Sequence, residues 1–295
     1  MSHTSDEIAS QPECWERAVR ETARHAKALP AEGERVAVIG CGTSLFMAQA
    51  YAQLREGLGQ GITDAFPASE AKLHRPYDRI LALTRSGTTT EIISALQEAP
   101  DPVRVTTVTA VADSPAAAMA DEVICLDYAD EQSVVQTRFP TTELLLLRAH
   151  LGLPTDDALA DLATALTAPL PDELTGAEQI TFLGADWSVG LAHEAALKVR
   201  EAAAHWTESY SAMEYRHGPV AVAREGRAVW SLVPVADSLA DQVRATGAYL
   251  RQGALDPLAE LVLAQRLAVR LAENAGRNPD RPEHLTRSVI LGSLG

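Results

Sequence analysis

The stretch RVAVI at residues 35–39, followed by GCGTS at residues 40–44, decides the fold class of this 295-residue chain. Its β-branched residues, flanked by charge on one side and by glycine on the other, predict a short buried strand that ends in a tight turn. A helical pattern then runs from Leu45 to Glu56. The order of strand, glycine turn and helix predicts one unit of a parallel α/β sheet.

The same order repeats along the first half of the chain. A second strand at 79–84 ends in the turn RSGTTT at 85–90 and leads into a helix at 91–98. Strands at 103–109 and 122–126 follow, separated by an alanine-rich segment. Strands that alternate with helices predict an α/β fold, an α-β-α sandwich whose parallel doubly wound sheet has helices on both faces.

The second half starts this pattern again, with a strand at 179–183, the turn GADWS at 184–188 and a long helix from about Val189 to Trp206. Its likeness to the segment 36–56 indicates a weak internal duplication. The proline-punctuated region 153–176, which contains a helical pattern at 156–166, is the predicted boundary.

Three further elements complete the expected second unit: strands at 228–233 and 247–250, and a helix at 256–275. The sequence therefore predicts an N-terminal helix and a first α/β unit within residues 1–155, a second unit at 170–280, and a C-terminal tail at 281–295.

The composition limits the partners of the chain. With 25 Lys and Arg against 40 Asp and Glu, the formal charge is −15, which disfavours nucleic-acid binding because that binding depends on basic surface. Phosphate can then be bound only at a local site built from backbone amides, hydroxyls or a positioned cation.

The location and the cofactors are also constrained by the sequence. No apolar run reaches the roughly 18 residues of a membrane span, and the polar N-terminus lacks a secretory signal, so we expect a cytoplasmic protein with no membrane partner. The spacing of the three cysteines, Cys14, Cys41 and Cys125, fits neither a disulfide framework nor a Cys-X-X-Cys metal site. We expect no metal and no cofactor.

The turn at residues 84–90, TRSGTTT, concentrates groups that can bind phosphate. Gly87 lets the backbone bend close to a ligand, and five hydroxyls together with Arg85 can donate hydrogen bonds to phosphate oxygens. The alternative is that these hydroxyls only cap a helix, because Ser and Thr are preferred in that position without any ligand. The turn lacks the Gly-Lys-Ser/Thr of a Walker loop.

A polar stripe is expected on the helix of the second unit. Glu194, Lys198, Glu201 and His205 are spaced so that they lie on one helical face. The alternative is an ordinary solvated face with a Glu–Lys pair. A zinc-protease motif is excluded, because HEAAL at residues 193–197 lacks the second histidine.

His217 is the candidate acid or base outside this helix. A turn-rich segment at 207–216 leads to His217, Gly218 and Pro219, and a histidine titrates near neutral pH. A loop histidine bonded to a carbonyl is the alternative for a lone residue of this kind.

Taken together, four ordered motifs resemble the sugar isomerase (SIS) family. They are GCGTS at 40–44, TRSG at 84–87, EAALKVRE at 194–201 and RHGP at 216–219. Within that family the chain is most similar to the isomerase half of glucosamine-6-phosphate synthases, over nearly its whole length, including DRPEHLTRSVI at 280–290.

The resemblance implies two SIS domains, usually in a homodimer, with a sugar phosphate held at their junction. It implies that Ser44, Thr84, Ser86 and Thr89 bind the phosphate. Glu201 would move a proton between C1 and C2 while Lys198 supports the developing charge. His217, contributed across the dimer interface, would open the sugar ring, and Thr286 and Arg287 of the tail would close over the substrate. Isomerisation needs such a carboxylate, such a cation and a remote phosphate that fixes the geometry.

Three departures from the synthase pattern change the expected activity. The chain begins with Met1 and Ser2 in place of a glutaminase domain with an N-terminal cysteine, so glutamine is not expected to be the nitrogen source. The tail lysine of the synthases is Arg287, whose guanidinium stays protonated and forms no imine. Arg85 and Thr88 replace Gln and Glu in the turn, which should favour anion binding and makes Arg85 a further expected phosphate ligand.

We therefore expect an amino-sugar-phosphate deaminase/isomerase that acts on a hexosamine 6-phosphate/ketohexose 6-phosphate pair. A fructosamine-6-phosphate deglycase and a plain aldose/ketose phosphate isomerase are alternatives that use the same proton transfer. A non-catalytic SIS protein that senses sugar phosphate is the alternative from another class.

Overall fold

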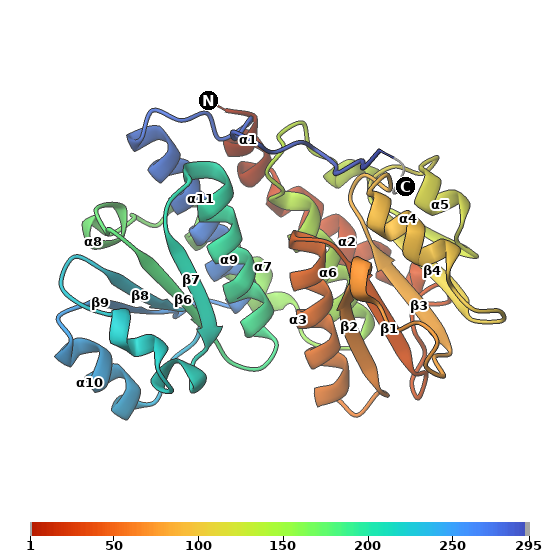
Figure 1. Cartoon of the computed structure of the whole chain (residues 1–295), viewed down its shortest axis with the longest axis horizontal. Helices are drawn as coiled ribbons and strands as arrows, with labels where there is room; N and C mark the ends of the chain where they lie inside the picture. The colour runs from red at the N-terminus through yellow and green to blue at the C-terminus, as the bar shows by residue number, and fades with distance from the viewer. Residues whose placement is uncertain (1, 293–295) are drawn as a thin grey trace. The chain divides into compact units, whose positions relative to one another are not determined.

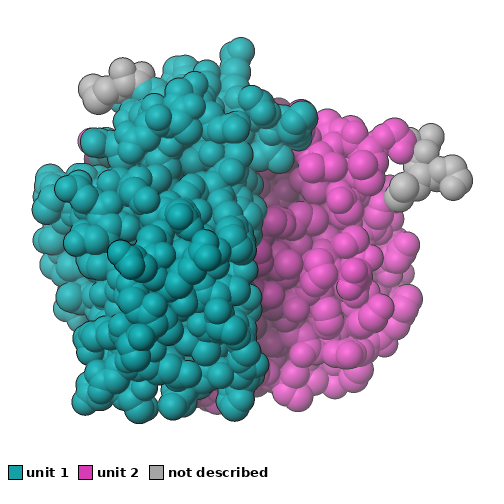
Figure 2. All heavy atoms as spheres, turned by 60° about the vertical axis from the view of Figure 1, so that its left-hand side comes forward, with its two compact units in different colours: residues 1–12, 132–137, 156–285 teal, residues 13–131, 138–155, 286–295 magenta. Residues whose placement is uncertain are grey.

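A computed structural model describes residues 2–292 of the chain; Met1 and the last three residues of the predicted tail lie outside the described residues. The contacts divide the chain into two compact units, coloured separately in Figure 2. Unit 1 comprises Met1–Pro12, Gln132–Thr137 and Asp156–Leu285, and unit 2 comprises Glu13–Glu131, Arg138–Thr155 and Thr286–Gly295. Each unit is therefore assembled from three separate segments of the chain. The expected domain bounds 1–155, 170–280 and 281–295 stay predictions.

Unit 2 contains a five-stranded sheet in the order β2-β1-β3-β4-β5, and all its strands are parallel. The strands are β1 (Val36–Gly40), β2 (Thr63–Pro67), β3 (Arg79–Leu83), β4 (Arg104–Thr109) and β5 (Glu122–Cys125). The predicted α/β fold with a parallel sheet is confirmed. The edge strand β2, TDAFP, was not predicted, because it is only half-buried and its Asp and Pro are unfavourable in strands.

Helices accompany this sheet (Figure 1). They are α2 (Gln11–His25), α3 (Thr43–Gly57), α4 (Thr90–Gln97), α5 (Pro115–Ala118) and α6 (Arg138–His150), with the short 3-10 turns η1 (Ala68–Glu70) and η2 (Asp127–Ala129). One apolar cluster joins strand residues to α4, α5 and the segment 68–77, while α3 and α6 pack against each other. Helix α6 was not predicted, because most of its residues are buried and its run of four leucines shows no amphipathic period.

The strand order of this sheet reverses next to β1. From β1 the chain passes to β2 on one side, and β3 pairs with β1 on the other side. In open α/β sheets, ligands bind beyond the carboxyl ends of the strands at such a reversal of order. The turns after β1 and β3, which carry GCGTS and TRSGTTT, therefore lie at the position where this fold binds ligands.

Unit 1 contains a second parallel sheet, with four strands in the order β7-β6-β8-β9. The strands are β6 (Ile180–Gly184), β7 (Thr207–Ser211), β8 (Ala228–Ser231) and β9 (Tyr249–Gln252). The helices are α1 (His3–Ala9), α7 (Asp156–Thr167), α8 (Asp172–Thr175), α9 (Ser188–Ala203), α10 (Asp237–Ala245) and α11 (Pro257–Asn274), with the 3-10 turns η3 (Glu214–Arg216) and η4 (Pro219–Val222). Helices α9 and α11 lie side by side, and α10 contributes to a separate apolar cluster (Figure 1).

The second sheet repeats the order of the first four strands of unit 2. The glycine that ends the first strand of each unit has the same packing. A Cβ added to Gly40 would lie 2.5 Å from the carbonyl carbon of Ser44, and one added to Gly184 would lie 2.5 Å from that of Ser188. Both distances are too short for any side chain, so each helix can approach its strand only because the strand ends in glycine.

Several details of unit 1 differ from the expectation. Helix α9 ends at Ala203, and Ala204 adopts a left-handed conformation with φ of 50°, so His205 and Trp206 lie outside the helix. The prediction that His205 extends the polar stripe is therefore wrong. The segment 207–211, expected to be turn-rich, is the edge strand β7, and α10 was not predicted.

Within residues 2–292, no helix combines the length and the apolar character needed to cross a membrane.

Candidate functional site

Two neighbouring turns in unit 2 bring hydroxyl groups to the carboxyl edge of the sheet. Ser44 lies in the first turn of α3, directly after β1, and is buried. Residues 84–90, which we call the hydroxyl loop, follow β3 and end at the start of α4. Because β1 and β3 are paired, the two turns are adjacent, and both lie where helix N-termini offer backbone N–H groups to an anion.

Gly87 allows the tight shape of the hydroxyl loop. Its φ is +64°, a left-handed conformation that favours glycine, and an added Cβ would lie 2.0 Å from Ser114 Oγ. The adjacent backbone is fixed as well, since the carbonyl of Arg85 accepts hydrogen bonds from Thr109 Oγ1 (3.1 Å) and from the amide of Ala110 (2.9 Å). The loop is therefore a closely packed turn rather than an open surface segment.

The hydroxyls of this loop do more than cap a helix. Thr84 Oγ1 accepts a hydrogen bond from the Gly87 amide (3.2 Å), and Ser86 Oγ accepts one from the Thr88 amide (3.2 Å). Thr89 occupies the N-cap of α4, yet its side chain makes no capping hydrogen bond. The capping alternative thus fails for the residue at which it would apply most directly.

Arg85 is directed away from solvent and is held by an acidic partner. Its Nη1 lies 3.3 Å from Glu131 Oε2, and the two side chains are 1% and 0% exposed. Its Nη2 donates a hydrogen bond to the carbonyl of Arg287 (3.2 Å). The expectation that Arg85 binds phosphate therefore concerns a guanidinium that already contacts a carboxylate and the tail.

The C-terminal residues 286–291, which we call the tail segment, run along the hydroxyl loop. Thr88 Oγ1 donates to Ser288 Oγ (2.8 Å), the Thr90 amide donates to the carbonyl of Val289 (3.2 Å), and the Leu291 amide donates to Thr90 Oγ1 (2.9 Å). Thr286 is exposed and donates to the carbonyl of Ser288 (2.8 Å). Closure of Thr286 and Arg287 over a substrate stays a prediction.

Helix α9 of unit 1 carries a buried ion triad. Lys198 Nζ lies 3.3 Å from Glu194 Oε1 and 2.5 Å from Glu201 Oε2. The side chains of Glu194 and Lys198 are 0% and 1% exposed, whereas that of Glu201 is 21% exposed. The alternative of a solvated helical face is therefore wrong for Glu194 and Lys198, since charges are rarely buried unless they are paired.

Glu201 borders a cavity of about 690 Å³ in unit 1. The end of α9 forms one wall, and residues 275–278 and 281–285 form the others. A volume of this size lies in the range of sites that hold small molecules, about 300 to 1,000 Å³. The triad thus places one partly exposed carboxylate, with a cation on its buried side, at the edge of a ligand-sized space.

The histidines contribute differently. His217 is exposed, and its backbone amide donates to the carbonyl of Glu214 (2.9 Å). Glu201 precedes the start of β7, and His217 follows its far end, so the length of this strand separates them within one chain. Burial lowers the pKa of His205, and burial together with the charge of Arg200 lowers the pKa of His193.

Other candidate chemistry is weaker. Burial, reinforced by the charge of Glu91, raises the pKa of Cys41 to about 11, so this thiol stays protonated and unreactive near neutral pH. Among the described residues, no three His, Cys, Asp or Glu side chains come together as a possible metal site.

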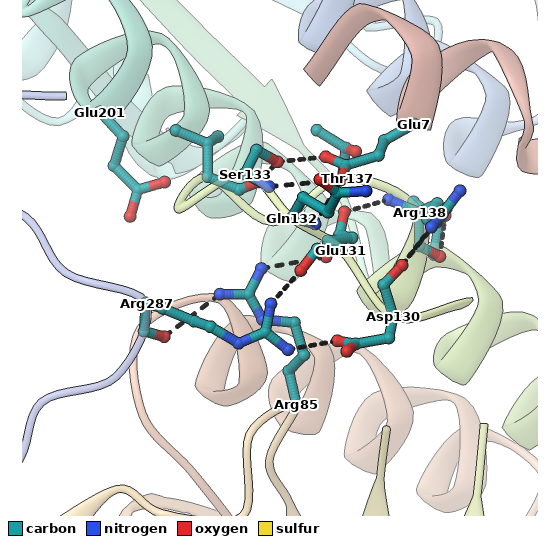
Figure 3. Close-up of polar contacts among 12 residues, drawn as sticks. Glu7, Arg85, Asp130, Glu131, Gln132, Ser133, Thr137, Arg138, Glu201 and Arg287 are labelled. Carbon is teal, nitrogen blue, oxygen red and sulfur yellow. Dashed lines mark hydrogen bonds and ion pairs between the residues drawn. The ribbon is translucent and has the colours of Figure 1, made fainter. Parts of the chain in front are cut away.

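Sequence reasoning missed Asp130 and Glu131, which contact the two arginines expected at the site. Asp130 Oδ1 lies 2.5 Å from Nη2 of Arg287, and the carbonyl of Glu131 accepts a hydrogen bond from Nη1 of the same residue (Figure 3). The two acids follow the short turn η2 far from residues 85 and 287 in the chain, and no periodicity marks them. Only the pairing of charge across the fold identifies them.

Comparison with known proteins supports the resemblance. Residues 31–149 match the model of the SIS domain. A glutamine–fructose-6-phosphate aminotransferase (isomerizing) of Pyrococcus horikoshii is 28% identical over 88% of this chain and 52% of its own length. The chain thus spans about half the length of the curated relatives it matches.

Solved structures share the fold over nearly the whole chain. A glucosamine-6-phosphate deaminase of Thermotoga maritima has a TM-score of 0.82 at 24% identity, covering 98% of this chain and 100% of that one. A tagatose-6-phosphate ketose/aldose isomerase of Escherichia coli has a TM-score of 0.81 at 20% identity, covering 100% and 98%. At these identities the likeness establishes the fold alone.

Proposed function

We propose that this chain, whose residues 31–149 match the SIS domain model, is an amino-sugar-phosphate deaminase/isomerase acting on a hexosamine 6-phosphate/ketohexose 6-phosphate pair. We also propose that residues 170–280 form a second SIS domain, since their sheet repeats the strand order of the first. The observation that carries the activity is the ion triad of α9, with Glu201 partly exposed at a ligand-sized cavity.

The roles follow the chemistry of each group. Glu201 takes the proton from C2 of the open-chain amino sugar and returns it to C1, because a carboxylate can carry a proton between adjacent carbons. Lys198 lies 2.5 Å from this carboxylate and stabilises the negative charge that develops on the enolamine intermediate. The resulting C2 imine reacts with water, and ammonia and a ketose phosphate are released.

Phosphate binding supplies the geometry for this step. We assign it to Ser44, Thr84, Ser86 and Thr89, which belong to the two adjacent turns of unit 2. Hydroxyls and backbone amides at helix N-termini suit an anion in a chain of formal charge −15, where no extended basic surface is expected. The binding energy of the remote phosphate then holds the reacting carbons in place.

The test is a substrate panel read simultaneously for ammonia, free amine and ketose phosphate. Hexosamine 6-phosphates should give ammonia and ketose phosphate. The variant Glu201→Gln should lose at least about a hundredfold in turnover, the usual contribution of a general base. Glu98→Gln, an exposed acid after α4, is the matched control and should keep full activity.

Other products select other activities. Release of an amino acid from fructosamine 6-phosphates would identify a deglycase, and turnover without any nitrogen product would identify a plain isomerase. Formation of a hexosamine 6-phosphate from the ketohexose 6-phosphate with glutamine as the nitrogen source would contradict the expected lack of glutaminase activity. Thermal stabilisation by sugar phosphates without turnover, equal in wild type and Glu201→Gln, would identify a regulatory protein and refute the proposal.

We further propose a homodimer in which His217 opens the sugar ring from the partner copy. The supporting observation is that β7 separates Glu201 from His217 within one chain. Mixing Glu201→Gln with His217→Ala chains should then restore about a quarter of wild-type activity, because half of the sites in each heterodimer retain both residues. No recovery after subunit exchange would contradict this arrangement.

A further inference from the structure

Five charged side chains of unit 2 gather beside the hydroxyl loop, and we call them the arginine cluster. Figure 3 shows how Arg85, Arg138 and Arg287 approach Asp130 and Glu131. The cluster carries one net positive charge. It joins the hydroxyl loop, through Arg85, to the tail segment, through Arg287.

Glu131 is the common partner of the three arginines. Its Oε2 pairs with the guanidinium of Arg85 (3.3 Å), and its Oε1 accepts the backbone amide of Arg138 (2.8 Å). Its carbonyl accepts a hydrogen bond from Nη1 of Arg287. Because one buried residue makes all three contacts, movement of Arg85 would disturb the attachment of the tail segment as well.

Arg85 also contacts the tail directly, since its Nη2 donates to the carbonyl of Arg287 (3.2 Å). For Arg85 to turn toward a phosphate in the loop, it would have to leave a fully buried carboxylate, which is strongly unfavourable when no other cation replaces it. The hydroxyls of Thr84 and Ser86 accept hydrogen bonds from loop amides, and their O–H groups can still donate to an anion without that rearrangement.

We propose that Arg85 is a positioning residue: through Glu131 and Arg287 it fixes the tail segment on the hydroxyl loop, and it is not a ligand of the phosphate. The proposal deepens the function given above and rests on it only for the phosphate measurement. The attachment of the tail is tested independently of any substrate.

Hydrogen exchange of the full-length protein tests the attachment. The Leu291 and Thr90 amides, which join the tail segment to the loop, should exchange about tenfold faster or more in Arg85→Gln and in Glu131→Gln. The double variant should show no larger effect than the stronger single variant, because both changes break the same pair.

Arg79→Gln is the matched control. Arg79 is another buried arginine of unit 2 that pairs with a glutamate, with Nε 2.9 Å from Glu34 Oε2, and it donates to Thr106 Oγ1 (2.8 Å). Its loss should lower the stability of unit 2 while leaving the exchange of Leu291 and Thr90 unchanged relative to the global rate. Equal acceleration in the control would show a general loss of stability and would overturn the proposal.

Inorganic phosphate is the probe for direct binding. A positioning role predicts that Arg85→Gln changes its dissociation constant by less than about threefold, whereas loss of a charge-assisted contact would weaken binding about tenfold or more. Tenfold weaker binding with unchanged tail exchange would overturn the proposal in favour of a direct ligand.

Glu131→Gln keeps the test decisive if Arg85→Gln does not fold, because it keeps the shape of the residue and removes only the charge. Unchanged tail exchange in this variant would refute the proposal. Faster exchange together with failure of the substrate panel would support the positioning role and refute the proposed activity, so the two failures are distinguishable.

Discussion

The turn after β1 in unit 2 and the turn after β6 in unit 1 have the same backbone packing, but their serine hydroxyls make different hydrogen bonds. In both, the last glycine of the strand leaves room for the residue four positions later, Ser44 in one and Ser188 in the other. Ser188 Oγ is used internally, since it accepts from the Ala185 amide (2.8 Å) and donates to the Ala185 carbonyl (2.7 Å). Among residues 2–292, none hydrogen-bonds to the Ser44 hydroxyl in this way.

The helices that follow these turns, α3 and α9, also differ in the residues at matched positions. Alignment of Gly40 with Gly184 puts Ala50, Leu54 and Gly57 of α3 at the positions of Glu194, Lys198 and Glu201 of α9. Ala50 and Leu54 are buried apolar residues, whereas Glu194 and Lys198 are buried charges. At these three matched positions only α9 carries charge, which shows that the fold fixes positions and leaves their chemistry open.

The largest effect is expected when α9 is given the pattern of α3. Lys198→Leu leaves Glu194 fully buried without its cation, which should lower the free energy of unfolding by about 3 to 5 kcal/mol. The double variant Glu194→Ala/Lys198→Leu removes both charges and should recover most of that loss. Chemical denaturation measures both, and equal losses in the single and double variants would contradict the pairing.

A second contrast concerns two buried glutamates. Glu194 of unit 1 is paired with Lys198, whereas Glu143 of α6 in unit 2 is fully buried and has no hydrogen-bond partner among the described residues. Burial raises the pKa of Glu143 well above its ordinary value of 4.5, so its folded form keeps the proton. The unfolded chain releases that proton as the pH rises.

The free energy of unfolding should consequently decrease as the pH rises above about 5. The decrease is about 1.4 kcal/mol per pH unit until the pH reaches the raised pKa of Glu143. Glu143→Gln removes this dependence, so the variant should be more stable than wild type at pH 7 and nearly equal to it at pH 4.5. Thermal unfolding over this pH range measures the difference. A stability difference between Glu143→Gln and wild type that stays constant at all pH values would refute the raised pKa of Glu143.

The smallest effects are expected from substitution of Ser188, which should change stability, and of Ser44, which should change phosphate affinity. Ser188→Ala loses two internal hydrogen bonds and should lower stability by about 1 to 2 kcal/mol, with no change in phosphate affinity. Ser44→Ala should leave stability within about 0.5 kcal/mol and weaken phosphate binding several-fold. Titration calorimetry with inorganic phosphate separates them, and identical behaviour of the two variants would mean that the turns are not specialised.

Strand and helix order could be predicted from the sequence where the local signal agrees with the packing. The strands around Val38 and Leu81 are buried on both faces and read as apolar runs. The edge strand β7 was missed, because its sequence TESYS is mostly half-buried and polar and gives no apolar strand pattern. The end of α9 was missed because Ala204, without Gly or Pro, gives no sign of its left-handed conformation.

The sequence predicted which residues belong to the candidate site, but it did not predict all of the contacts that these residues make. The motifs identified Lys198, Glu201 and the hydroxyl loop, and local spacing was sufficient to bring Lys198 and Glu201 together. The contact of Arg85 with Glu131 joins residues 46 positions apart and depends on how η2 follows β5. Only the folded structure contains that information.

The hydrogen bond between Thr88 and Ser288 joins residues 200 positions apart, which has a consequence for synthesis on the ribosome. The hydroxyl loop emerges long before its partner in the tail, and at about 5 to 20 residues per second the delay is roughly 10 to 40 seconds. The five strands of unit 2 are complete once Cys125 has been made, whereas Thr88 gains its contact with Ser288 only when the tail segment has been made. The contacts between the hydroxyl loop and the tail segment therefore form only after the strands of both sheets have been made.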